Sequence, residues 1–257
     1  MRRNLRLLGV SWLLNVKQLM RSSFDSLLAI LWPLFFATVA FFMFRAGGDP
    51  DALVYASLGA AVMGIWTSTS VTAGAAVQRE RWQGTLELLV AAPAHFSLVL
   101  LPLAFATSAI GIYCMTTTLL FGRFVFGIDL TLEHPLVMAA AIPATILSIG
   151  ALGFLMATCF ARYRAAWALG AMMEYPVWLL CGFLVPLALL PSWSHPVSWA
   201  LAPTWGMRAI RESSTGGTPL PDIGMCILLG SIYVALGIAA TESILRSARR
   251  TASLSLS

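Results

Sequence analysis

The sequence predicts an all-α membrane protein with six transmembrane helices, an N-terminal interfacial helix, and short extracellular helices before the last span. Its 257 residues are 59% hydrophobic and only 11% charged. The mean hydropathy of +0.83 also lies far outside the range of soluble globular proteins. A spanning helix needs about 20 predominantly apolar residues to cross a hydrocarbon layer roughly 30 Å thick. The chain contains six apolar segments of that length.

These six segments occupy most of the chain and leave no stretch long enough for an ordinary soluble domain. We therefore expect residues 1–257 to form a single transmembrane domain. The predicted spans are residues 26–44, 53–77, 96–121, 136–161, 165–190 and 223–245.

The basic residues lie mostly on one side of this six-span arrangement, which predicts its orientation because cytoplasmic loops are enriched in arginine and lysine. Both termini and the loop of residues 78–93 are therefore predicted to be cytoplasmic, in a plasma (inner) membrane. A net charge of +5 distributed in this way does not indicate nucleic acid as a partner. Twelve basic residues fall on the predicted cytoplasmic side, and four, Arg45, Arg123, Arg208 and Arg211, fall outside.

The chain ahead of the first span, residues 1–24, carries apolar side chains at helical spacing. They are Leu5, Leu8, Trp12, Val16 and Leu19. This spacing favours a cytoplasmic helix lying in the membrane interface. A plain basic flank to the first span is the alternative.

The segment 191–222 is apolar but broken by prolines, so it does not form one straight span. Proline is tolerated in a first helical turn, and short helices are expected to begin near Pro196 and Pro203. Trp193, Trp199 and Trp205 suit the headgroup level of the membrane. We expect this segment to be extracellular.

The run from Gln78 to Leu89 is charged although it lies between two long apolar spans. Gly84 and Thr85 supply a turn and a hydroxyl group that favours a helix start. Glu87 is placed where the positive end of the helix dipole stabilises an acid. The run has both a polar and an apolar face, so a docking surface explains it better than a solvated loop.

In order and spacing this run, with Val90-Ala91-Ala92-Pro93, resembles the cytoplasmic loop of ABC-2 type permeases, the membrane subunits of ATP-driven exporters. The segment 191–222 resembles the outer short helices of the same family. The resemblance implies a permease subunit that moves an amphipathic drug-like molecule, lipid or glycolipid out of the cell. Drug-resistance permeases are the closest subgroup. The resemblance of the charged run to the family's cytoplasmic loop implies that the ATPase is contacted by Arg79, Glu80, Arg81, Gly84, Thr85, Leu86 and Glu87.

The resemblance also implies the partners: two copies of a separate ABC ATPase, which would hold ATP and magnesium, and a second permease subunit, identical or related. The chain itself lacks the glycine-rich phosphate loop with its lysine. Its only lysine, Lys17, lies between Val16 and Gln18. His95, His134 and His195 match no metal-binding spacing. We therefore expect neither an enzyme nor a metal site, and no cofactor bound by this chain.

Glu174, in the fifth predicted span, is an intramembrane charge and thus a candidate for the translocation path, together with Tyr175. A structural hydrogen bond at the Pro176 helix break is the alternative. Arg208 and Glu212 lie four residues apart on an expected helix and can pair with each other, so these residues and Arg211 are interpreted as a solvated face. Contact with an anionic substrate is the alternative. The rival function is an ion-gradient-driven secondary transporter with Glu174 as proton carrier. No clear internal repeat supports it, and it leaves the charged run unexplained.

Overall fold

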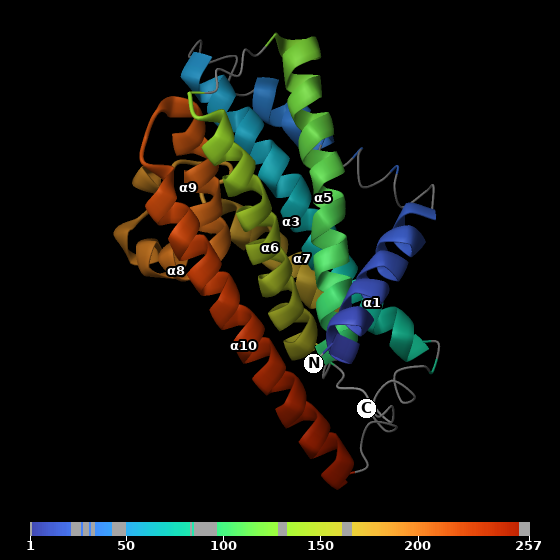
Figure 1. The fold of residues 1–257 in the computed structure, drawn as a ribbon. Helices are drawn as coiled ribbons and strands as arrows, with labels where there is room; N and C mark the ends of the chain where they lie inside the picture. Colours follow the sequence, from blue (N-terminus) through green and yellow to red (C-terminus); the bar gives the residue numbers. More distant parts are fainter. Residues whose placement is uncertain are drawn as a thin grey trace.

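A computed structural model describes residues 2–21, 27, 31, 34–42, 50–82, 84, 97–127, 133–160 and 166–251. Every regular element within these residues is a helix, which agrees with the predicted all-α class (Figure 1). The labelled helices are α1 (Arg2–Arg21), α3 (Pro50–Trp82), α5 (Ser97–Phe126), α6 (Pro135–Phe160), α7 (Ala166–Leu180), η1 (Leu187–Leu189), η2 (Ser192–Ser194), α8 (His195–Ala200), α9 (Ala202–Thr215) and α10 (Pro219–Thr251).

Three of the described helices are long and apolar enough to cross a membrane: Leu100–Phe126, Pro135–Cys159 and Pro219–Ser243. Leu53–Thr69, within α3, is a shorter apolar helix. These segments coincide with the second, third, fourth and sixth predicted spans. Residues 34–42, in the first predicted span, are helical as well.

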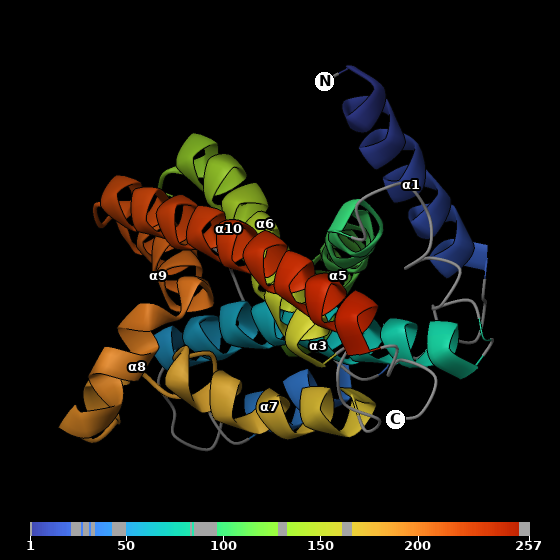
Figure 2. The same ribbon diagram turned by 90° about the horizontal axis from the view of Figure 1, so that it is seen from below.

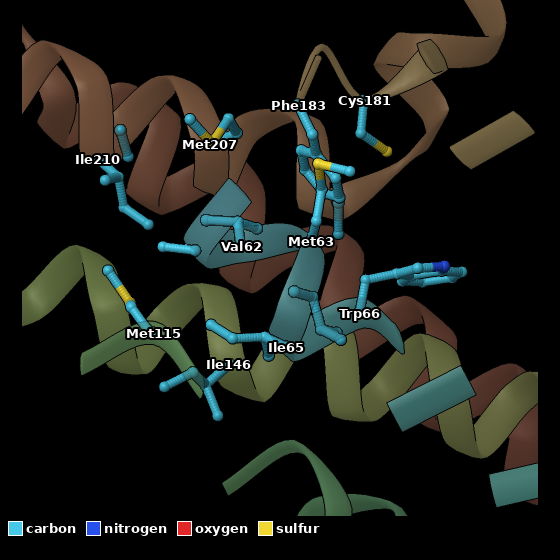
Figure 3. Packing of buried hydrophobic residues seen from close by; sticks show 14 of the residues in the cluster. Val62, Met63, Ile65, Trp66, Met115, Ile146, Cys181, Phe183, Met207 and Ile210 are labelled. Carbon is cyan, nitrogen blue, oxygen red and sulfur yellow. The ribbon is translucent and has the colours of Figure 1, made fainter. Parts of the chain in front are cut away.

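The centre of the bundle is formed by α3, α5 and α6. These helices approach one another closely at glycine residues, which have no side chain. A Cβ atom on Gly111 of α5 would lie 2.8 Å from the Cα of Ile65 in α3. A Cβ atom on Gly150 of α6 would lie 2.6 Å from the Ser108 hydroxyl oxygen in α5. Gly150 therefore lies on a face that packs within the bundle, as small residues do in membrane helices. Around these contacts lie the large buried side chains, among them Trp66 and Phe183 (Figure 3).

Helices α6 and α10 run parallel to each other. Gly230 of α10 packs on Ser148 of α6, and further along, the hydroxyl groups of Thr241 and Thr158 lie 3.3 Å apart. Two helices that run in the same direction require the intervening chain to return across the molecule. Helix α7 provides that return, antiparallel to α3.

Helix α7 ends at Leu180, so the prediction of a fifth span over 165–190 is wrong in its second half. The end is a Schellman cap, in which the amide of Phe183 donates to the Trp178 carbonyl at 3.0 Å and that of Gly182 donates to the Leu179 carbonyl at 3.1 Å. Gly182 has φ +71°, a conformation that glycine adopts without strain. A turn and the helix η1 follow instead of a continued span.

The segment 191–222 folds into short helices, and Pro196 and Pro203 lie in the first turns of α8 and α9 as predicted. Their position across the membrane remains a prediction. The Tyr233 hydroxyl donates to the carbonyl of Ala200 and accepts from the amide of Ala202 at 3.2 Å. Tyr233 lies 14 residues into α10, about 21 Å along that helix. The α8–α9 break therefore lies beside α10 well away from its first turn. Figure 2 shows α8 between α9 and α7.

Helix α1 packs along α5. Leu8 and Val16, from the predicted apolar stripe, are half-buried, whereas Val10, Leu13 and Leu14 are exposed. Trp12, from the same stripe, is 39% exposed, so the stripe faces the bundle only in part. The interfacial position of α1 remains a prediction.

Candidate functional site

The charged run at the end of α3 is helical up to Trp82. Arg79, Glu80 and Arg81 therefore form the last turn of a long helix, where a loop over 78–93 was predicted. Glutamine, arginine and glutamate are good helix formers, so the helix continues beyond the apolar part of the span. In Figure 1 this end of α3 lies at the same end of the bundle as the end of α10.

Gly84 lies in a turn, as the sequence predicted. Its φ of +68° lies in the left-handed region, and a Cβ atom there would meet nothing within 4 Å. Side chains larger than glycine are therefore disfavoured at Gly84 by the backbone conformation and not by crowding. The other predicted coupling residues, Thr85, Leu86 and Glu87, lie outside the described residues.

Glu174 of α7 is bound to α3. The Thr67 hydroxyl donates a hydrogen bond of 2.5 Å to the Glu174 carboxylate, and Glu174 is half-buried. This contact joins two helices and is distinct from a local repair at Pro176, the alternative that the sequence left open. A carboxylate at this depth needs such a partner because lipid supplies none.

Tyr175 does not join this contact. Its side chain is 61% exposed and its ring packs edge-to-face on Trp178, with 5.2 Å between centroids. Neighbouring residues of a helix point about 100° apart, which separates the two predicted path residues. Only Glu174 faces another described helix with its polar group.

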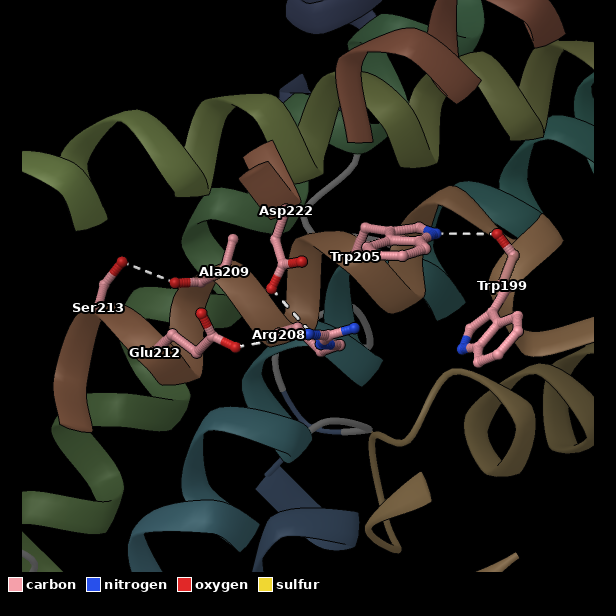
Figure 4. A network of polar contacts seen from close by, with 7 residues as sticks. All are labelled: Trp199, Trp205, Arg208, Ala209, Glu212, Ser213 and Asp222. Carbon is pink, nitrogen blue, oxygen red and sulfur yellow. Dashed lines mark hydrogen bonds and ion pairs between the residues drawn. The ribbon is translucent and has the colours of Figure 1, made fainter. Parts of the chain in front are cut away.

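A second polar cluster joins α9 to the start of α10 (Figure 4). Arg208 lies 3.6 Å from the Glu212 carboxylate, as their spacing predicted, and 3.4 Å from that of Asp222. The side chain of Asp222 is only 5% exposed. Trp205 packs against Arg208 and donates its indole N–H to the Trp199 carbonyl at 2.8 Å. These residues brace the short helices, and the solvated interpretation applies only to the outer part of the cluster.

Arg211 contradicts the prediction of a solvated residue. Its guanidinium carbon lies 3.1 Å from the ring centroid of Tyr55 in α3, and burial lowers its pKa to about 10. The group therefore remains protonated at neutral pH. A protonated arginine in apolar surroundings is favoured by the negative face of an aromatic ring.

Sequence reasoning found Glu174 but missed its partner Thr67, and it missed Tyr55 and Tyr233 altogether. One signal was available, because each is a polar side chain inside an apolar segment. Their partners lie 107, 127 and 33 residues away in the chain, so spacing alone could not pair them.

These features define a polytopic helical membrane protein with apolar spanning helices and a charged helix end. The ABC-2 type transporter family model matches residues 6–214, and the chain belongs to this family. It is thus a membrane component of an ABC transporter. A comparison with curated proteins found no match.

Proposed function

We propose that this chain is the membrane-spanning permease subunit of an ATP-driven exporter, with six spans and both termini in the cytoplasm of a cell whose plasma (inner) membrane it crosses. The observation that carries the proposal is the family match over residues 6–214. The exported substrate is an amphipathic drug-like molecule, a lipid or a glycolipid, which suits a path through apolar helices.

ATP would be hydrolysed by a separate subunit. A phosphate-binding loop needs a lysine after its glycines, and the one lysine of this chain, Lys17, has no such neighbours. Two ATPase copies would hold ATP and magnesium, and two permease subunits would enclose one path. The ATPase would contact Arg79, Glu80, Arg81 and Gly84, together with Thr85, Leu86 and Glu87.

The continuous α3 helix gives this proposal a physical route for coupling. Its charged last turn belongs to the same continuous helix as the buried residues up to Thr69, so a displacement of that turn moves the helix that packs on α5, α6 and α7. ATP would drive the change only if it binds one arrangement of the complex more tightly than the other.

Glu174 is proposed to line the path, since it is half-buried and its hydrogen bond spans α3 and α7. In the resting arrangement Thr67 would stabilise the carboxylate. Movement of α7 relative to α3 would expose it to the path.

The test is purification of the chain from its own cells and its reconstitution with the ABC ATPase that accompanies it, in proteoliposomes that contain either Hoechst 33342 or NBD-labelled phosphatidylglycerol. We expect the ATPase to co-purify and one probe to move only with ATP. A matched complex whose ATPase lacks its catalytic glutamate is the control. Transport that follows a proton gradient and ignores ATP would contradict the proposal and favour a secondary transporter using Glu174.

A further inference from the structure

Three elements meet at the outer end of α3: Tyr55 and Gly59 of α3, the turn after α7, and Arg211 of α9. The cap that ends α7 leaves the carbonyl groups of Gly182 and Phe183 beyond the helix's own hydrogen bonds. The Tyr55 hydroxyl donates to the Gly182 carbonyl at 2.8 Å, and Arg211 Nη2 donates to the Phe183 carbonyl at 3.4 Å. Side chains from two other helices thus satisfy both groups, as an apolar environment requires.

The same junction brings Arg211 and Tyr55 into direct contact, with the guanidinium over the ring at 3.1 Å. One turn further along α3, Gly59 lies against the Phe183 carbonyl, and a Cβ atom there would collide with it. Arg211 Nη2 would be 3.6 Å from that Cβ position. The guanidinium is thus enclosed by α3 and the cap of α7, and its Nε atom is fully buried.

Helix α9 is otherwise held by a different part of the bundle. It packs on α6 and α10 and touches α3 over a much smaller area. Gly206 lies against Thr145 of α6, and Met207 and Ile210 are fully buried. Helix α7 in turn packs mainly on α3. Arg211 therefore joins α9 directly to the α3–α7 pair, in addition to the packing of α3 on α6 at the centre of the bundle.

We propose that Arg211 is a positioning residue for transport, which keeps α9 attached to the outer end of α3 so that a displacement of the charged end of α3 reaches α9. This inference rests on the proposed function, because it assigns that displacement to an ATPase. Helix α3 is continuous over 33 residues, about 50 Å, and can transmit it.

The junction stays closed during the cycle because opening it is unfavourable. Separation would leave a desolvated cation without its aromatic ring and two buried carbonyl groups without donors. A movement of this end of α3 is therefore passed to α9 through the junction and is not absorbed by it.

The first test measures probe molecules transported per ATP hydrolysed in the reconstituted complex, with the probe that moves in the test above. Arg211→Gln is expected to lower this ratio about tenfold, in the range of typical coupling energies, while ATPase recovery and ATP hydrolysis stay close to those of the parent. Tyr55→Leu should act alike, and the double variant should lose less than the two single losses combined, because both variants remove the Arg211–Tyr55 contact while each also removes its own bond to the cap of α7. Arg211→Lys should have a higher transport ratio than Arg211→Gln, since lysine keeps a cation at this position.

Arg208→Gln is the matched control, because Arg208 lies on the same helix but is 41% exposed and contacts α10 instead of α3. Its ratio should remain that of the parent. Equal ratios for Arg211→Gln and the parent would overturn the proposal. So would a parallel loss of recovery, hydrolysis and transport, which is the sign of a purely structural role.

The second test replaces the junction with a covalent link. Tyr55→Cys and Arg211→Cys are combined in a chain whose own cysteines, Cys114, Cys159, Cys181 and Cys226, are changed to alanine. Before linking, the transport ratio should be as low as in Arg211→Gln. A short bis-methanethiosulfonate linker should restore it, and a reductant should abolish it again. A linked complex that hydrolyses ATP without transport would show that the junction must open, which contradicts the proposal. A parent complex that moves neither probe would contradict the proposed function itself. A parent that transports, with an equal ratio in Arg211→Gln, would contradict this inference alone, so the two failures are distinguishable.

Discussion

The hydroxyl group of Thr67 in α3 donates a 2.5 Å hydrogen bond to the carboxylate of Glu174 in α7. The bond links two antiparallel helices that the sequence separates by 107 residues. It places the one conspicuous intramembrane charge of the predicted spans at a helix–helix contact. Structure and transport can therefore be tested separately at this pair.

Glu174→Gln retains an acceptor for Thr67 but removes the charge, so it should change the free energy of unfolding by less than about 1 kcal/mol. Its transport rate should nevertheless fall, because the charge is proposed to line the path. Thr67→Val leaves the carboxylate without its donor and should destabilise the protein by about 1–2 kcal/mol. For both variants, unfolding in nanodiscs measures the stability change and ATP-driven probe transport measures the transport rate. Unchanged transport by Glu174→Gln would leave Glu174 with a structural role alone.

Tyr233→Phe removes a single oxygen atom and leaves two backbone groups at the α8–α9 break without partners. Because this break lies beside α10 well away from its first turn, the loss should cost about 1–3 kcal/mol. Hydrogen exchange at the Ala202 amide should accelerate as a direct sign of the lost contact. Tyr175→Phe is the control, since that side chain is largely exposed. Equal stability of Tyr233→Phe and the parent would contradict the bridging role.

Gly111→Ala and Gly224→Ala form a matched pair on two spanning helices. A Cβ atom on Gly111 would press on the backbone of Ile65, whereas one on Gly224 would meet nothing within 4 Å. The first change should destabilise the bundle by about 1–3 kcal/mol through overpacking. The second should be neutral or stabilising, since alanine favours helix. Thermal unfolding in the same nanodiscs compares them, and a reversed order would show that α5 and α3 do not pack as described.

Much of the fold could be predicted because hydropathy reports which stretches avoid water. The predicted spans over 53–77, 96–121, 136–161 and 223–245 fall on α3, α5, α6 and α10. The fifth span failed beyond Leu180 because both sides of the turn are apolar. The turn depends on Tyr55, whose hydroxyl reaches Gly182 from a helix 127 residues away in sequence.

The candidate site was predictable to a smaller extent, because a local pattern identifies a charged residue but not its distant partner. A charge in an apolar span identified Glu174, and the charged run identified the end of α3. Arg211 was assigned to a solvated face together with Arg208 and Glu212, because oppositely charged residues four apart on a helix commonly form exposed pairs. Its burial follows from α9 packing between α6, α10 and α3, which no local pattern encodes.

The central claim is that the charged end of α3 transmits the action of an ATPase. Glu80→Ala measures it most directly in the reconstituted complex, with Glu133→Ala, an exposed acid in another segment, as control. Removing a charged contact at the subunit interface should lower transport per ATP hydrolysed by about tenfold, without loss of the protein from the membrane. Gly84→Val should act in the same direction, because valine is strained at φ +68°. Full transport and unchanged ATPase binding in both variants would contradict the account.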